Sequence, residues 1–140
     1  MIALNIKSKK NTLMDSLLNF DEFHGEITEW KSMVNLVRDE LKIFNDELSK
    51  IAKKNSSTDI LRHVEHFQNQ FIRQNEVSDE FFHDLKQADK AIKRQLEANE
   101  TQASEVLGGD HSVLRDRANT YERIFKDLKN EYHSFLEKAI

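Results

Sequence analysis

Residues 26–51 read EITEWKSMVNLVRDELKIFNDELSKI, and this stretch decides the fold. Its apolar residues recur at alternating spacings of three and four: Ile27, Trp30, Val34, Val37, Leu41, Phe44, Leu48 and Ile51. This heptad pattern is typical of an α-helix that packs an apolar stripe against neighbouring helices. Met33, Leu36 and Ile43 lie beside the stripe and make it wider than a contact between two helices needs. The pattern therefore predicts a helix over residues 26–54 with more than one neighbour.

Two further heptad stripes follow along the chain. The first contains Ile60, Val64, Phe67, Phe71, Gln74, Ser78, Phe81, Leu85, Ala88, Ile92, Gln95 and Asn99. The second contains Leu114, Ala118, Tyr121, Phe125, Leu128, Tyr132, Phe135 and Ala139. They predict helices over residues 57–107 and 110–140, with Gly108 as the cap between them. An end of the middle helix near Asn99, followed by a longer loop, is the alternative boundary.

The segment before the first stripe, residues 1–24, also contains helix-forming apolar residues, and Gly25 separates it from residues 26–54. We therefore expect a short N-terminal helix in front of the three long ones. The predicted fold is a single all-α domain over residues 1–140, an antiparallel helical bundle with coiled-coil-like packing.

Composition excludes several classes of function. The 140 residues include no cysteine, so disulfide frameworks, thiolate nucleophiles and cysteine-held metals are excluded. The net charge is −4, and the two signs alternate along the chain, which argues against a nucleic-acid partner. The sequence contains no apolar run long enough to span a membrane and no signal peptide, so we expect a cytoplasmic protein. Contact of residues 1–23 with a membrane surface, through Lys7, Lys9 and Lys10, is a minor alternative.

Histidines are the only residues that suggest chemistry. His63 and His66 are three residues apart, and Glu80 with His83 forms a Glu-x-x-His motif, which helical bundles use to hold metal pairs. The alternative function is therefore a small metal-binding bundle that uses these four residues. A ferritin-like site needs a second such motif, and the ligand order of hemerythrin-like proteins does not occur here, so the chain is similar to both families in architecture only. The preferred prediction, in contrast to this alternative, is that the protein binds no metal and no cofactor.

Catalytic motifs do not occur in the sequence. It has no glycine-rich phosphate loop, no Gly-x-Ser-x-Gly and no His-Glu-x-x-His, so we predict that the chain is not an enzyme. The polar residues within the second stripe are expected to fix the register of packing or the oligomeric state rather than to line a ligand site. These residues are Gln74, Ser78, Gln95 and Asn99.

An apolar surface for a partner is predicted from the helix lengths. With a turn at Gly108, the last helix ends about halfway along the middle one, and part of the middle helix then faces only residues 37–51. The residues left open are Val64, Phe67, Phe71 and Ile72. Large open apolar patches are uncommon on monomers, so we expect a second copy or another helical protein to dock there. Trp30, Phe44, Phe67 and Phe71 are the expected core and interface anchors. The predicted function is a non-catalytic protein–protein interaction or assembly module, most simply a homodimer.

Overall fold

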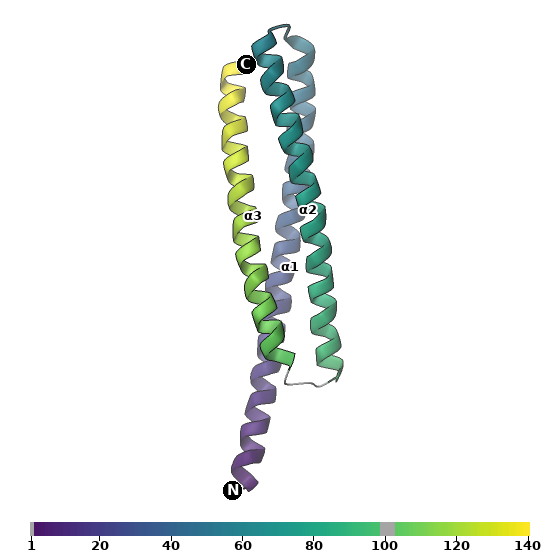
Figure 1. Cartoon of the computed structure of the whole chain (residues 1–140), viewed down its shortest axis with the longest axis vertical. Helices are drawn as coiled ribbons and strands as arrows, with labels where there is room; N and C mark the ends of the chain where they lie inside the picture. The colour runs from purple at the N-terminus through teal and green to yellow at the C-terminus, as the bar shows by residue number, and fades with distance from the viewer. Residues whose placement is uncertain (1, 99–102) are drawn as a thin grey trace.

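Three helices make up the protein. The computed structural model describes the backbone of residues 2–98 and 103–140, and the side chains of residues 19–98 and 107–140. The helices are α1 (Ile2–Lys54), α2 (Thr58–Ala98) and α3 (Ala103–Ala139), and they lie side by side (Figure 1). The described backbone contains no β-strand. The predicted all-α class with three long helices is confirmed.

The first helix is longer than predicted. Residues 2–24 belong to α1, so the expected short N-terminal helix and its break at Gly25 are wrong. A glycine in a helix interior costs about 1 kcal/mol relative to alanine, which is too little to end a helix that has good helix formers on both sides. The chain also lacks proline, which would break the hydrogen-bond ladder. At the other end, the side-chain amide of Asn55 donates to the carbonyl of Ile51 at 2.8 Å and closes the last turn.

The second helix begins close to the predicted position. The carbonyl of Ser57 accepts a hydrogen bond from the backbone N–H of Leu61 at 3.0 Å, which is the first helical bond of α2. Ser57 is therefore the N-cap residue, a position that serine favours. The connection between α1 and α2 is limited to residues 55–57.

The boundary between α2 and α3 differs from the first prediction. The middle helix ends at Ala98 rather than at residue 107, and α3 begins at Ala103 and runs through Gly108 and Gly109. The alternative of an end near Asn99 is therefore the correct one, although Asn99 itself lies outside the described residues. Two helical glycines cost about 2 kcal/mol. The earlier start lets α3 reach further along the bundle, and each large apolar side chain that it buries contributes about 1.5–3 kcal/mol.

Interhelix ion pairs show how the helices are aligned. Lys31 pairs with Asp89, and Arg38 pairs with Asp79, so residue numbers on α2 fall as those on α1 rise. Arg115 pairs with Glu26 across an offset of 89 residues, and Lys129 pairs with Glu40 across the same offset. Thus α3 runs in the same direction as α1. We call the end with the α1–α2 connection the tip and the opposite end the base.

Beyond the base, α1 continues without a neighbouring helix. The offset of 89 residues places Ala103, the first residue of α3, level with Met14 of α1. The pair between Lys31 and Asp89 places the end of α2 near residue 22 of α1. Residues 2–13, named here the α1 extension, therefore project past both helices, as Figure 1 shows. At 1.5 Å per residue the α1 extension is about 18 Å long.

The core follows the predicted stripes closely. The buried apolar residues on α1 are Phe20, Ile27, Val34, Val37, Leu41, Phe44, Leu48 and Ile51. Those on α2 and α3 are Val64, Phe67, Phe71, Phe81, Leu85, Ile92, Ala118, Tyr121, Phe125, Leu128, Tyr132 and Phe135. Trp30 is partly buried and packs against this core. The stripes therefore predicted which face of each helix is buried.

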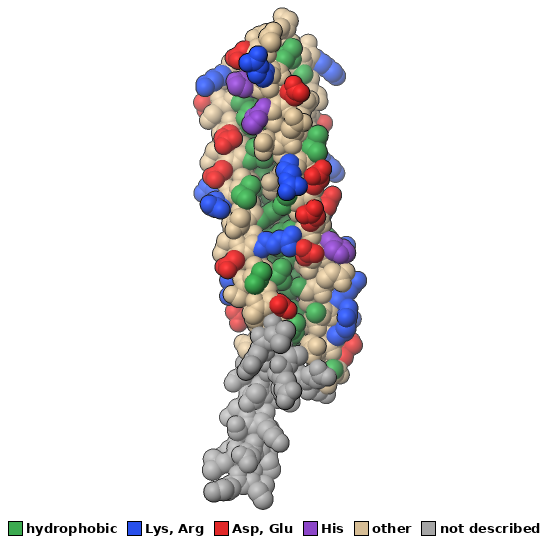
Figure 2. All heavy atoms as spheres, viewed as in Figure 1, with side chains coloured by type: hydrophobic (Ala, Val, Ile, Leu, Met, Phe, Trp, Pro, Cys, Tyr) green, Lys and Arg blue, Asp and Glu red, His purple; other side chains and the backbone are tan. Residues whose placement is uncertain are grey.

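The described surface is highly charged. Figure 2 shows Lys and Arg side chains interleaved with Asp and Glu on either side of a line of hydrophobic side chains between helices. Within the described residues, none of the helices has an apolar stretch long enough to cross a membrane. Both observations agree with the sequence-based expectation of no transmembrane segment.

Candidate functional site

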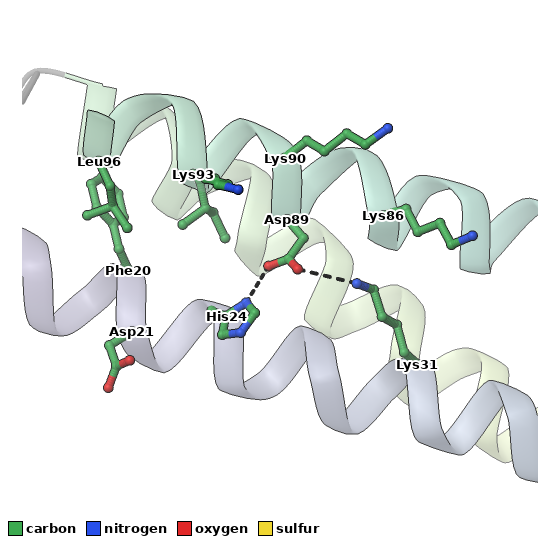
Figure 3. A pocket seen from close by; sticks show the side chains of 10 residues that line it. Phe20, Asp21, His24, Lys31, Lys86, Asp89, Lys90, Lys93 and Leu96 are labelled. Atoms are coloured by element: carbon green, nitrogen blue, oxygen red, sulfur yellow. Dashed lines mark hydrogen bonds and ion pairs between the residues drawn. The ribbon is translucent and has the colours of Figure 1, made fainter. Parts of the chain in front are cut away.

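A groove near the base, between α1 and α2, is the first candidate site. Its volume is about 510 Å³, within the range of small-molecule sites. We call it the basal groove. It is lined by Phe20, Asp21, His24, Lys31, Lys86, Asp89, Lys90, Ile92, Lys93 and Leu96. Figure 3 shows Phe20 and Leu96 at one end of the groove, and Lys31 and Lys86 at the other. One end is thus apolar and the other is cationic.

Asp89 joins the two walls of the basal groove. Its carboxylate lies 2.5 Å from Nδ1 of His24 and 3.3 Å from Nζ of Lys31, and Figure 3 shows both partners pointing at it from α1. Burial raises the pKa of Asp89, but the hydrogen bonds from His24 and Lys31 outweigh it, and the net pKa is below the usual value. The carboxylate is therefore charged at neutral pH and holds α2 against α1.

A buried histidine on α3 forms the second polar feature, packed against α1. The ring of His111 lies 4.1 Å from the ring of Phe23 and 5.1 Å from that of Trp30, centroid to centroid, and it is stacked on both. Its Nε2 is 3.3 Å from Oε1 of Glu26, without hydrogen-bond alignment, and neither ring nitrogen has a hydrogen-bond partner among the described residues. Burial lowers the pKa of His111, and the nearby Glu26 carboxylate only partly offsets this. His111 is therefore neutral at pH 7.

Glu26 is held in place by an arginine. Arg115 donates to both carboxylate oxygens, at 2.7 Å and 3.1 Å, in the bidentate geometry that guanidinium favours. These hydrogen bonds hold the pKa of Glu26 below its usual value, against the opposing effect of burial. The pair links α1 to α3 just as Asp89 links α1 to α2.

A polar layer crosses the middle of the core. Ser78 is fully buried, donates to the carbonyl of Gln74 at 2.7 Å, and lies 2.6 Å from the hydroxyl oxygen of Tyr121 on α3. Burial raises the pKa of Tyr121, so its hydroxyl stays protonated. Gln74 is also buried, whereas Gln95 is only partly so. Two of the four polar stripe residues thus lie inside the core.

The four residues of the alternative metal site are not brought together. They all lie on α2, and fourteen residues separate His66 from Glu80, which is about 21 Å along a helix. His63 and His66 instead contact the rings of Phe135 and Phe67 edge-on. Within residues 19–98 and 107–140, no three His, Asp or Glu side chains are grouped to hold a metal ion.

The predicted docking residues occupy a different environment from the one expected. Val64, Phe67 and Phe71 are buried, and the tip aromatic cluster is formed by Phe44, Phe67, Phe71, Tyr132 and Phe135. Contrary to the expectation from the sequence, α2 is covered at the tip, because α3 starts early enough to reach it. Ile72 alone of the four is exposed, at 56%. Phe44, Phe67 and Phe71 do act as core anchors.

Tyr132 closes this cluster toward α1. Its single hydroxyl proton is shared between two acceptors, the carbonyl of Phe44 at 3.2 Å and the carboxylate of Glu47 at 3.1 Å. Burial and the neighbouring Glu47 carboxylate raise its pKa well above the usual value. A buried hydroxyl with two acceptors fixes the position of α3 against α1 near the tip.

Sequence reasoning missed His111, His24 and Asp89. His111 follows Leu107 by four residues and precedes Leu114 by three, so it occupies a stripe position, and extending the stripe backwards past Gly108 would have found it. The pairing of His24 with Asp89 depends on the alignment of two distant segments. The local sequence carries no signal for that pair.

The fold defines an all-α protein of three helices whose polar clusters tie the helices together. Comparison of the chain with known protein families, with curated proteins and with solved structures finds no match.

Proposed function

We propose that this chain is a non-catalytic protein–protein interaction or assembly module, an antiparallel three-helix bundle that docks a second copy of itself through the α1 extension. The observation that supports this most directly is the difference in helix length. α1 has 53 residues, against 41 in α2 and 37 in α3, so its first turns lie beyond the described parts of both neighbours (Figure 1).

The sequence of the α1 extension matches a packed helix. Ile6, Leu13, Phe20 and Ile27 follow one another at intervals of seven residues, the same position of successive heptads. Phe20 and Ile27 are buried in the core. The pattern that buries these two residues thus continues into residues 2–13, where none of the described helices packs against it.

An unpaired helix of this length is weakly stable. Most helical stability in proteins comes from packing of an apolar face, and the α1 extension has no described neighbour that would supply it. A second copy that packs on Ile6 and Leu13 would supply this burial. The docking surface proposed here lies at the base, whereas the sequence alone had indicated the tip.

The non-catalytic part of the proposal is supported by the role of the polar groups. Asp89, Glu26 and the hydroxyl of Tyr121 each make contacts that join two helices. Groups that form such contacts contribute to the alignment of the bundle.

Light scattering of the full chain tests the proposal. We expect a mass of about 33 kDa, twice the 16.5 kDa of one chain, at concentrations of about 100 µM. The double variant Ile6→Asp/Leu13→Asp is expected to be monomeric with an unchanged unfolding transition of the bundle. The matched control Asn5→Asp/Thr12→Asp changes polar residues of the same turns and is expected to remain dimeric.

Two results would overturn the proposal. One is a monomeric full chain at the same concentration. The other is a dimer that the double variant leaves intact, because the dimer would then be held by another surface.

A further inference from the structure

The basal groove has the dimensions of a site for an alkyl chain. Its lining runs from Phe20 to Lys31 on α1 and from Lys86 to Leu96 on α2, which is about 16 Å along each helix. Its apolar end is formed by Phe20 and Ile92, which are almost fully buried, and by the partly buried Leu96.

The groove carries an excess of positive charge. Four lysines line it, against the two carboxylates of Asp21 and Asp89. Asp89 is already paired with His24 and Lys31. Among the described residues, Lys86, Lys90 and Lys93 make no ion pair, and the ammonium of Lys86 instead lies 4.9 Å from the centroid of the Phe82 ring.

Size and charge decide between possible occupants. A helix of about 10 Å diameter and 16 Å length occupies about 1,200 Å³, more than twice the groove volume, so it would lie mostly outside the groove. The α1 extension of a second copy carries Lys7, Lys9 and Lys10, so like charges oppose its docking here. A slender chain with an anionic end matches both the volume and the charge.

We propose that the basal groove binds a single-chain alkyl carboxylate. The alkyl chain packs against the partly buried Leu96, above the floor of the groove that Phe20 and Ile92 form. The carboxylate meets the ammonium group of Lys86 at the cationic end of the groove, and Lys93, two helical turns away on the same side of α2, adds to the positive potential along it. This site is independent of the proposed dimerisation through the α1 extension.

Calorimetric titration with monomeric sodium dodecanoate tests this site. The full chain is expected to bind one equivalent. The variant Lys86→Glu/Lys93→Glu is expected to bind at least about tenfold more weakly, since two attractive contacts become repulsive. The control Lys126→Glu/Lys138→Glu makes the same charge change at exposed positions of α3 and is expected to bind within about twofold of wild type. Circular dichroism of each variant checks that the helices are intact.

Amide chemical shifts locate the ligand, and vesicles test its source. Dodecanoate is expected to shift the amides of residues 20–31 and 86–96. The absence of binding heat, shifts confined to other residues, or equal loss of affinity in both charge variants would overturn the proposal. Binding to anionic phosphatidylglycerol vesicles without binding of dodecanoate would also overturn it, because the cationic rim would then recognise a membrane surface.

Discussion

Replacing His111 with phenylalanine is expected to raise the free energy of unfolding by about 1–2 kcal/mol at pH 7.5. Both ring nitrogens are buried without a hydrogen-bond partner among the described residues, and an unsatisfied buried polar group costs about 1–3 kcal/mol. A phenyl ring keeps the stacking on Phe23 and Trp30. A cavity of about 70 Å³ borders the ring and gives room for its extra volume.

The gain is expected to increase as the pH falls from 7.5 to 5.5. Because burial lowers the pKa of His111, the unfolded chain takes up a proton near the ordinary value of 6.5, while the folded protein remains neutral. Wild-type stability therefore falls below that pH, by at most about 1.4 kcal/mol per pH unit. The facing Glu26 has a lowered pKa, so its contribution is lost only below its ordinary value of 4.5, and Arg115 stays charged throughout.

Urea unfolding followed by circular dichroism at the two pH values measures this difference. His83→Phe is the matched control, because His83 is exposed on α2, and its stability change is expected to stay within about 0.5 kcal/mol. The reasoning would be refuted by a His111→Phe variant that is less stable than wild type. It would also be refuted if, between pH 7.5 and 5.5, the variant lost as much stability as the wild type.

Three further substitutions test the packing, each by urea unfolding. Phe71→Ala is expected to lower the free energy of unfolding by about 3–5 kcal/mol, against about 0.5 kcal/mol for the exposed neighbour Ile72→Ala; similar values would contradict the burial at the tip. Ser78→Ala is expected to cost about 1–3 kcal/mol, because it removes the partner of the buried Tyr121 hydroxyl, and an unchanged stability would contradict this. Tyr132→Phe is expected to cost about 1–2 kcal/mol at pH 7. That difference should narrow above pH 10, because a raised pKa makes the wild-type contribution disappear as the pH rises through it; a constant difference would contradict the assignment.

The buried residues could be predicted from the sequence, because heptad spacing is a local property. A residue such as Leu41 repeats at the helical period, so its face follows from its neighbours in sequence. The same logic correctly placed Gln74 and Ser78 on the buried face, although they are polar. The contact of Ser78 with Tyr121 was not predictable, because the spacing fixes a face and not the residue opposite.

The end of α2 was misplaced because a local signal was given too much weight. Gly108 and Gly109 favour a turn, but their cost in a helix is about 1 kcal/mol each. The burial of Tyr132 and Phe135 against Phe67 exceeds that cost, and it depends on contacts 65 or more residues away along the chain. Tertiary packing therefore outweighs the glycine preference here.

This boundary also determines where a partner is needed. A turn at Gly108 would shorten α3 toward the tip and leave Phe67 and Phe71 open, whereas the early start of α3 covers them and leaves the α1 extension as the part of the bundle without a neighbour. The apolar pattern of the α1 extension and the lysines of the basal groove then distinguish two sites at the base. The α1 extension continues the heptad of Phe20, so it favours a helix as its partner, while the lysine-lined basal groove is too narrow for one. Because different residues form the two sites, Ile6→Asp/Leu13→Asp should abolish dimerisation without changing dodecanoate affinity, and Lys86→Glu/Lys93→Glu should do the reverse.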